Sequence, residues 1–166
     1  MPGPDDLVSE AELARRLADA IPEKLRKIAT AERPIEIRPI DPTNPLRPEK
    51  RPPIRGVWFR AIDRLPDDPA VHRYLLAYAS DFHFLTTAMQ PHGVPWLVPG
   101  MQVASLDHAM WFHRPLRCDD WLLYACDSPS AQGARGLARG MIYDGERRLV
   151  ASTAQEGLIR VIPPAT

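Results

Sequence analysis

The sequence predicts an α+β fold in which a long antiparallel sheet wraps around one central helix. Three observations lead to this prediction: one strong helical pattern in the middle of the chain, several strand-like segments after it, and one strand with a face of small residues. A chain of 166 residues can bury one substantial core, so we expect one domain with peripheral segments.

The composition limits the classes of partner and compartment. Lysine plus arginine and aspartate plus glutamate both number 21, a balance that argues against a nucleic acid or an anionic membrane as partner. The chain begins with polar residues and has no apolar stretch near the roughly 20 residues that span a bilayer. Cys118 and Cys126 lack a CxxC spacing, and Cys126 lies in an apolar run. We therefore expect Cys126 to be a buried thiol rather than part of a disulfide or metal site, and the compartment to be reducing and cytoplasmic.

The beginning of the chain is predicted to be a connector. Apolar residues at helical spacing between Glu10 and Ala29 indicate a short accessory helix pair, which Pro22 must break. We therefore assign residues 1–33 to an N-terminal connector, 34–162 to the main domain and 163–166 to a tail.

Two strands precede the central helix. Alternation of apolar and polar residues predicts them at Pro34–Ile40 and Ile54–Ile62. The segment between them, residues 41–53, contains five prolines, which cannot supply a regular ladder of backbone donors and therefore form a loop.

The central helix begins after two candidate cap residues, Asp67 and Asp68. Pro69 fits the first turn because the amide hydrogen that proline lacks would have no helical partner there. Apolar positions then recur at i, i+3, i+4, i+7, i+8 and i+11, a broad stripe that can pack against a sheet. The stripe consists of Val71, Tyr74, Leu75, Tyr78, Ala79 and Phe82.

Four long strands are predicted after the helix, and the Asp144-Gly145 pair marks a hairpin between the last two. They span Met101–His113, Trp121–Asp127, Ala134–Tyr143 and Arg148–Ile162. Period-two alternation gives the third strand one face of small residues, on which a helix can approach closely. That face consists of Ala134, Gly136, Ala138 and Gly140.

The sequence has none of the short motifs that mark common catalytic devices, such as GxSxG, a P-loop, GxGxxG or HExxH. His108 and His113 are five residues apart on a predicted strand. Their rings should therefore point to opposite faces, and we expect hydrogen-bonding roles rather than a metal site. Asp119 and Asp120 precede a strand, where carboxylates usually support turn geometry.

The functional signal lies in several separate segments, and their order matters. These segments are Tyr74–Phe82, Gln90–Gly93, Ala104–Pro115, Ser130–Gly140 and Val150–Gly157. Together they resemble the second hotdog of the TesB-type acyl-CoA thioesterase II family, and the similarity runs from about Arg33 to Val161. The resemblance implies a single hotdog unit that hydrolyses acyl-CoA thioesters.

The resemblance also implies the site residues. The family has an aspartate late in the central helix, a hydroxyl residue on the following strand and a glutamine near the end of the last strand. These correspond here to Asp81, Ser105 and Gln155. Most relatives have threonine at the position of Ser105, so the hydroxyl is kept while the methyl group that restricts its rotamer is lost.

The chemistry of these residue types agrees with that assignment. A thioester carbonyl is electrophilic and its thiolate leaves readily, so a positioned water is sufficient and we expect neither a cofactor nor a metal. Asp81 is the expected general base, while Ser105 and Gln155 are expected to hold and aim the water. Without the resemblance, each residue is more simply a solvated, capping or hydrogen-bonded structural group.

Two further groups of residues have two interpretations each. Four aromatic residues are core residues first, with the lining of an acyl channel as the alternative. They are Trp111, Phe112, Trp121 and Tyr124. Arg135 and Arg139 share the face opposite the small residues, where they either contact CoA phosphates or form a solvated surface.

Familiar members of the family carry two hotdog units in one chain, whereas this sequence supplies one. A lone unit exposes a sheet edge and one wall of the groove for the acyl-CoA substrate. We therefore expect a homodimer or pairing with a separately encoded first half. A non-catalytic hotdog that binds acyl-CoA or pairs with a catalytic partner is the alternative. A hydratase or dehydratase, which would use His83 beside Asp81, is a third hypothesis.

Overall fold

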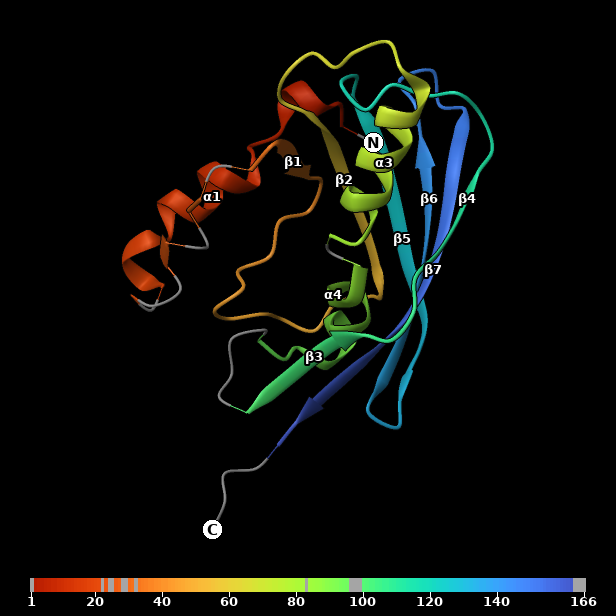
Figure 1. Cartoon of the computed structure of the whole chain (residues 1–166). Coiled ribbons are helices and arrows are strands. Elements are labelled where there is room, and N and C mark those ends of the chain that lie inside the picture. The colour runs from red at the N-terminus through yellow and green to blue at the C-terminus, as the bar shows by residue number, and fades with distance from the viewer. Residues whose placement is uncertain are drawn as a thin grey trace.

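Seven antiparallel strands curl around two helices in the part of the chain that the structure describes (Figure 1). This computed structural model describes residues 2–21, 23, 26–27, 30–31, 33–82, 84–95 and 100–162. The strand order is β1-β2-β5-β6-β7-β3, and β4 pairs with another stretch of β7 on the same side as β3. The strands are β1 (Ile35–Pro39), β2 (Ile54–Ala61), β3 (Met101–Ser105), β4 (Ala109–Phe112), β5 (Leu122–Gln132), β6 (Arg135–Tyr143) and β7 (Leu149–Val161).

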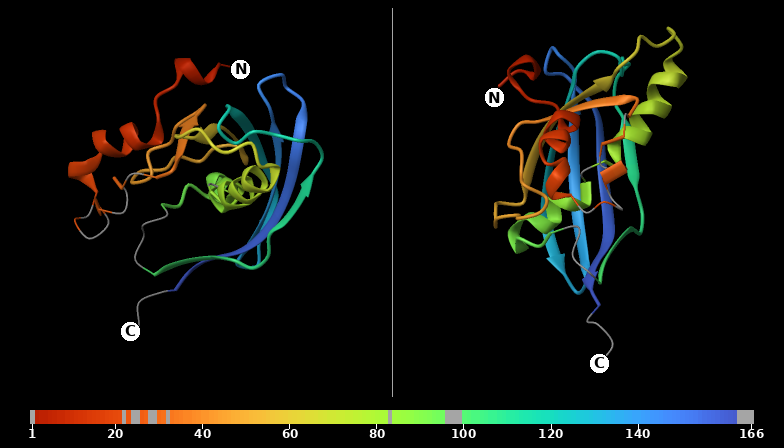
Figure 2. Two further views of the ribbon diagram at one scale, coloured as in Figure 1. Left: turned by 45° about the horizontal axis from the view of Figure 1, so that its top comes forward. Right: turned by 90° about the vertical axis from the view of Figure 1, so that its left-hand side faces the viewer.

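The helices α3 (Pro69–Ser80) and α4 (Phe84–Met89) follow one another along the concave side of the sheet. The helix α1 (Glu10–Arg16) lies apart from them and contacts β1 (Figure 2). There are also three 3-10 turns, η1 (Pro4–Asp6), η2 (Ala18–Ala20) and η3 (Gln90–His92), and residues 23, 26 and 27 are helical. A long antiparallel sheet curled around a central helix is a hotdog fold, so the predicted fold class is confirmed.

Some sequence predictions concern positions outside the described residues. They are the helix break at Pro22, the role of His83 and the tail at 163–166. None of the described helices combines the length and the apolar character needed to cross a membrane.

The helix α3 begins as predicted but buries a different face. Asp68 caps it by accepting a hydrogen bond from the backbone N–H of Ala70 at 2.8 Å, and Pro69 occupies the first turn. The predicted stripe was wrong for Tyr74 and Tyr78, which are 73% and 54% exposed. The prediction is correct for Ala79, which is buried, and for Leu75 and Phe82, which pack against the core. The other buried positions are His72, Leu76 and Ser80.

Internal hydrogen bonds explain why polar residues of α3 are buried in place of tyrosines. The N–H of Cys118 donates to Nδ1 of His72 at 3.1 Å, and the Ser80 hydroxyl lies 2.8 Å from the carbonyl of Ala77 and 2.8 Å from Nε2 of His108. A buried polar group with a partner costs little. A pattern that counts only apolar residues therefore misplaces the buried face.

The predicted strand at 101–113 was wrong as a continuous element, because it breaks into β3 and β4. The backbone N–H of Leu106 donates to the carbonyl of Glu156 at 2.9 Å. The Asp107 carboxylate accepts the N–H of Glu156 at 2.8 Å. Leu106 and Asp107, the first two residues of the break, are thus both hydrogen-bonded to Glu156 of β7.

The turns also differ in part from prediction. The tight turn with two positive φ angles falls at Gly133 and Ala134, between β5 and β6, and β5 therefore extends to Gln132. The hairpin at Asp144 is present, but its positive φ lies at Arg147. The Asp144 carboxylate closes that turn by accepting the N–H of Glu146 and Arg148.

The face of small residues on β6 receives α4. Gly136 lies opposite Gly157 on the adjacent strand β7, and both face the helix. A Cβ at Gly136 would meet Cβ of Ala88 at 2.6 Å, and one at Gly157 would overlap the Leu85 side chain. The paired glycines therefore set how closely α4 approaches the sheet.

Replacing Gly136 with alanine tests this close approach. We expect the free energy of unfolding to fall by about 1–3 kcal/mol, because the new methyl group must displace Ala88. Gly145→Ala is the matched control, since a Cβ there meets nothing within 4 Å, and it should change stability by less than about 0.5 kcal/mol. Urea denaturation measures both, and equal stabilities would contradict the packing of α4.

An ionic cluster joins the segment before α3 to the segment before β5. Arg117 donates two hydrogen bonds to the carboxylate of Asp119, at 3.0 and 2.9 Å, and pairs with Asp67. The N–H of Leu65 also donates to Asp119, whose side chain is 2% exposed. The hydrogen bonds from Arg117 hold the pKa of Asp119 well below its ordinary range, although burial acts in the opposite direction.

Asp119 should therefore make stability depend on pH. A lowered pKa in the folded state stabilises the fold above the unfolded pKa, and this contribution is lost as the pH falls. Asp119→Asn should lower the free energy of unfolding by about 2 kcal/mol at pH 7, with a smaller difference from wild type at about pH 3. The control Asp120→Asn removes an exposed carboxylate and should change little. Urea denaturation at both pH values would contradict this role if the Asp119→Asn difference were the same at each.

Candidate active site

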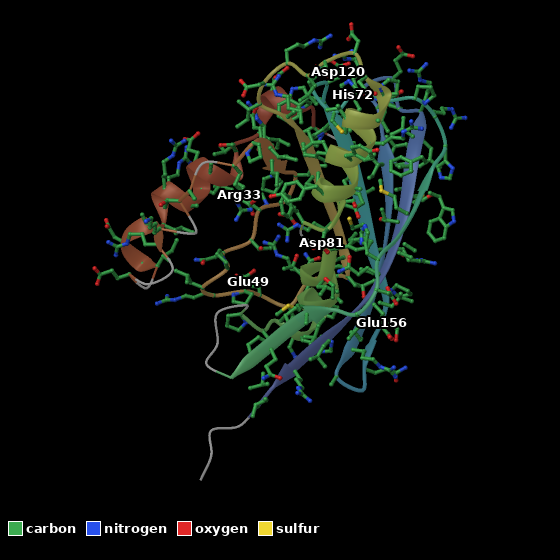
Figure 3. The ribbon with its side chains drawn as sticks, viewed as in Figure 1. Arg33, Glu49, His72, Asp81, Asp120 and Glu156 are labelled. Carbon is green, nitrogen blue, oxygen red and sulfur yellow. The ribbon has the colours of Figure 1, made fainter. Side chains whose placement is uncertain are left out.

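Three polar side chains meet beside the junction of α3 and α4, where Figure 3 labels Asp81. The side-chain nitrogen of Gln155 donates to Oδ1 of Asp81 at 2.9 Å and to Oγ of Ser105 at 2.6 Å. The Ser105 hydroxyl also lies 3.4 Å from Oδ1 of Asp81. The structure thus brings together all three residues that the sequence predicted for the site.

Each residue reaches the site from a different element. Asp81 is the C-cap of α3, so its side chain lies where the helix ends. Ser105 is the last residue of β3 and pairs with Gly157, which has no side chain to obstruct it. Gln155 lies on the inner face of β7 and is 1% exposed. The cluster is therefore fixed by a buried amide between two exposed groups.

The two carboxylate oxygens of Asp81 differ in their hydrogen-bond partners. Both amide hydrogens of Gln155 are directed at Asp81 and Ser105. Among the described residues, Oδ2 of Asp81 receives no hydrogen bond. Asp81 and Ser105 are both exposed, so this carboxylate oxygen is available to a water or a substrate.

A hollow of about 240 Å³ opens beside the cluster. Four of its lining residues are apolar, and the polar ones are Asp81, Ser105 and Thr86. An apolar cavity with a few convergent polar groups is typical of small-molecule sites. The residues that line it are Asp81, Phe84, Leu85, Thr86, Val103, Ala104 and Ser105.

The sequence predicted a hydrogen-bonding role for His108 but did not connect His108 or Ser80 with this cluster. Nδ1 of His108 lies 2.6 Å from Oε1 of Gln155, and Nε2 of His108 lies 2.8 Å from Oγ of Ser80. A continuous strand would have sent Ser105 and His108 to opposite faces, and the break after Ser105 removes that restriction. The Ser-Leu-Asp sequence before His108 is a signal of such a break, since serine and aspartate favour turns.

The predicted separation of the two histidines holds. His108 contacts Gln155 on the inner face of β7, whereas His113 contacts the Ser152 hydroxyl on the outer face. No cluster of three or more potential metal ligands occurs within the described ranges.

The aromatic residues proposed for an acyl channel have other surroundings. Tyr124 belongs to the core, and its hydroxyl donates to the carbonyl of Ser80 at 2.9 Å. The guanidinium group of Arg60 lies over the ring of Trp121, with its central carbon 4.4 Å from the ring centroid. Trp111 and Phe112 are exposed on β4. The prediction of a core residue is thus correct for Tyr124 and wrong for Trp111 and Phe112, which are exposed.

The two arginines of the outer face lie beside carboxylates. Arg139 forms an ion pair with Asp127, and Arg135 lies 3.7 Å from the carboxylate of Glu156. Both arginines are exposed, which agrees with a solvated surface.

Comparison with known structures places the chain among hotdog-fold proteins. It superposes on 56% of an acyl-CoA thioesterase II from Mycobacterium marinum, with a TM-score of 0.72, 38% identity and 99% of this chain covered. A putative thioesterase from Syntrophus aciditrophicus, 12% identical with a TM-score of 0.60, shares the fold over 89% of this chain and 93% of its own.

The chain belongs to the acyl-CoA thioesterase family, whose model matches residues 24–158. Acyl-CoA thioesterase 2 of Haemophilus influenzae is 42% identical over 157 residues, which are 95% of this chain and 55% of that protein. Human acyl-coenzyme A thioesterase 8 is 42% identical over 143 residues, 86% of this chain and 44% of that protein. The chain thus spans about half the length of the curated relatives it matches.

Gln155→Glu tests the geometry of the cluster without reference to activity. The new carboxyl would lie next to that of Asp81, and two carboxylates in one site cannot both ionise without a penalty. We expect the free energy of unfolding to fall by about 2 kcal/mol at pH 7 and to recover towards pH 5. Gln155→Leu, which adds no charge, should lose stability equally at both pH values. Urea denaturation of the two variants makes the comparison, and parallel pH profiles would contradict the placement of Asp81.

Proposed function

We propose that this domain hydrolyses acyl-CoA thioesters to a free acid and CoA by means of an activated water. The observation that carries the proposal is the hydrogen-bonded cluster of Asp81, Ser105 and Gln155 at the mouth of an apolar hollow. Membership of the acyl-CoA thioesterase family supports the substrate class.

In the proposed reaction, Asp81 is the general base. A water bound at Oδ2 of Asp81 transfers a proton to that oxygen while its own oxygen adds to the thioester carbonyl. The tetrahedral intermediate then collapses, the carbon–sulfur bond breaks, and the thiolate of CoA leaves and takes up the proton. Neither a metal nor a covalent intermediate enters these steps.

Ser105 and Gln155 have different proposed roles. The Ser105 hydroxyl is exposed beside Asp81 and is the second contact for the water. Gln155 uses both amide hydrogens on Asp81 and Ser105, so it fixes the two groups that contact the water. The two groups that orient the water are therefore already in place before the substrate binds.

We further propose that the active form is a paired assembly. Exposed apolar side chains lie on α3 and at β4, which pairs on one side only among the described strands: Tyr74, Tyr78, Leu106, Trp111 and Phe112. Such an edge favours association. A homodimer would supply the second wall of the groove, and a separately encoded first half is the alternative partner.

A non-catalytic domain that binds acyl-CoA, or serves only as a pairing partner, is the second candidate function. The exposure of Asp81 and Ser105 in the single unit favours it, because efficient catalysis requires water to be controlled at the site. A cytoplasmic location, without a nucleic acid or membrane partner, is proposed from the composition alone.

Asp81→Asn tests the proposed base. We expect the rate of thiol release from a saturated acyl-CoA to fall by roughly 10²–10⁴-fold, because the amide cannot accept the proton from water. Asp120→Asn, which removes a carboxylate far from the cluster, should keep the wild-type rate. Equal rates for wild type and Asp81→Asn would exclude Asp81 as the base.

Light scattering combined with a hydrolysis assay on the same sample tests the pairing. We expect an active species of twice the 18.7 kDa chain mass. Phe112→Arg at the open edge should give an inactive monomer, whereas Met141→Arg, exposed on β6, should remain an active dimer. A fully active wild-type monomer would contradict the requirement for pairing. An inactive wild-type monomer would favour a separately encoded first half over the homodimer.

A further inference from the structure

We propose that His108 is a positioning residue that fixes the orientation of the Gln155 amide, with Ser80 as its buried support. The inference rests on the proposed function, because it assigns His108 a part in preparing Asp81 and Ser105. His108 touches neither of these residues in the described contacts, so its action passes through Gln155.

The amide of Gln155 has two orientations of nearly equal shape, and only one of them is productive. With the nitrogen towards Asp81 and Ser105, the amide donates to both. The reversed amide would place its oxygen against the Asp81 carboxylate, where two acceptors repel each other. A donor on the far side of the amide therefore selects the productive orientation.

His108 supplies that donor from its Nδ1 atom, 2.6 Å from Oε1 of Gln155. In a neutral imidazole with a hydrogen on Nδ1, Nε2 must be an acceptor. The buried Ser80 hydroxyl lies 2.8 Å from Nε2 and also 2.8 Å from the carbonyl of Ala77. Its single hydrogen can serve only one of these two acceptors at a time, and we assign it to Nε2. The hydrogen that then remains on Nδ1 fixes the orientation of the amide.

The four residues form a closed ring of contacts. Ser80 and Asp81 are adjacent in the chain at the end of α3, and the ring runs from Ser80 through His108 and Gln155 back to Asp81. A closed ring resists rotation of any one member, because each side chain is held at both ends.

Two further contacts hold His108 itself. The ring of Phe84 meets the imidazole edge-on, with centroids 5.9 Å apart. Asp107, the preceding residue, accepts the N–H of Glu156, which follows Gln155 on β7. His108 is therefore fixed to the same strand that carries the amide it orients.

Asparagine and glutamine substitutions distinguish the two imidazole nitrogens. The side-chain nitrogen of asparagine reaches the region of Nδ1, and that of glutamine reaches the region of Nε2. We expect His108→Ala and His108→Gln to lower kcat by about 10–100-fold with little change in KM. His108→Asn should restore kcat to within a few-fold of wild type. The matched control is His113→Asn, at the other end of β4 on the outer face, and it should change neither constant.

A spectroscopic measurement tests the hydrogen bond itself. Nitrogen NMR of the wild-type protein at about pH 8.5, where an ordinary imidazole is neutral, should show the His108 hydrogen on Nδ1. Ser80→Ala should shift this tautomer balance towards Nε2. A hydrogen on Nε2 in the wild type would overturn the proposal, as would equal kcat values for the alanine and asparagine variants. Absence of hydrolysis by the wild type would instead overturn the proposed function, whatever the tautomer.

Discussion

The candidate site depends on the hydrogen bonds that fix residues 106 and 107 to Glu156. They end β3 after Ser105 and allow β4 to begin after His108. In a continuous strand, the side chains of Ser105 and His108 would point to opposite faces, and one of them could not reach Gln155. With the break, the buried amide of Gln155 has a partner on each side. The break also fixes the open edge of the sheet, since β3 and β4 occupy one side of β7 in succession.

Packing of the helices determines the other half of the site. The paired glycines Gly136 and Gly157 let α4 lie close to the sheet, and α3 ends where α4 approaches. The Asp81 side chain, at the end of α3, contacts the Gln155 amide, and the ring of Phe84 contacts the ring of His108. Small residues on two adjacent strands thus set how closely α4, the helix that follows Asp81, approaches the sheet.

Patterns in the sequence correctly predicted the features that are determined by residues close together in the chain. The cap at Asp68, the first-turn proline and the face of small residues on β6 all depend on neighbouring residues, and the structure has each of them. The phase of α3 and the break at residues 106–108 depend on distant partners, such as Cys118 for His72 and Glu156 for Asp107. Asp81, Ser105 and Gln155 were found through a family resemblance, because no spacing links residues 81, 105 and 155. A hydrogen-bonding role was predicted for His108, but its contact with Gln155 was not, because that contact follows from the break.

The two cysteines have a practical consequence for measurement. Cys118 and Cys126 are free and buried, and burial raises the pKa of each thiol to about 12. The thiolate is the form that reacts with thiol-specific reagents, so the folded protein adds little background to a colour reaction that detects released CoA. When the protein unfolds, both thiols become reactive. A single reagent can therefore report turnover in the native protein and the loss of its fold on heating.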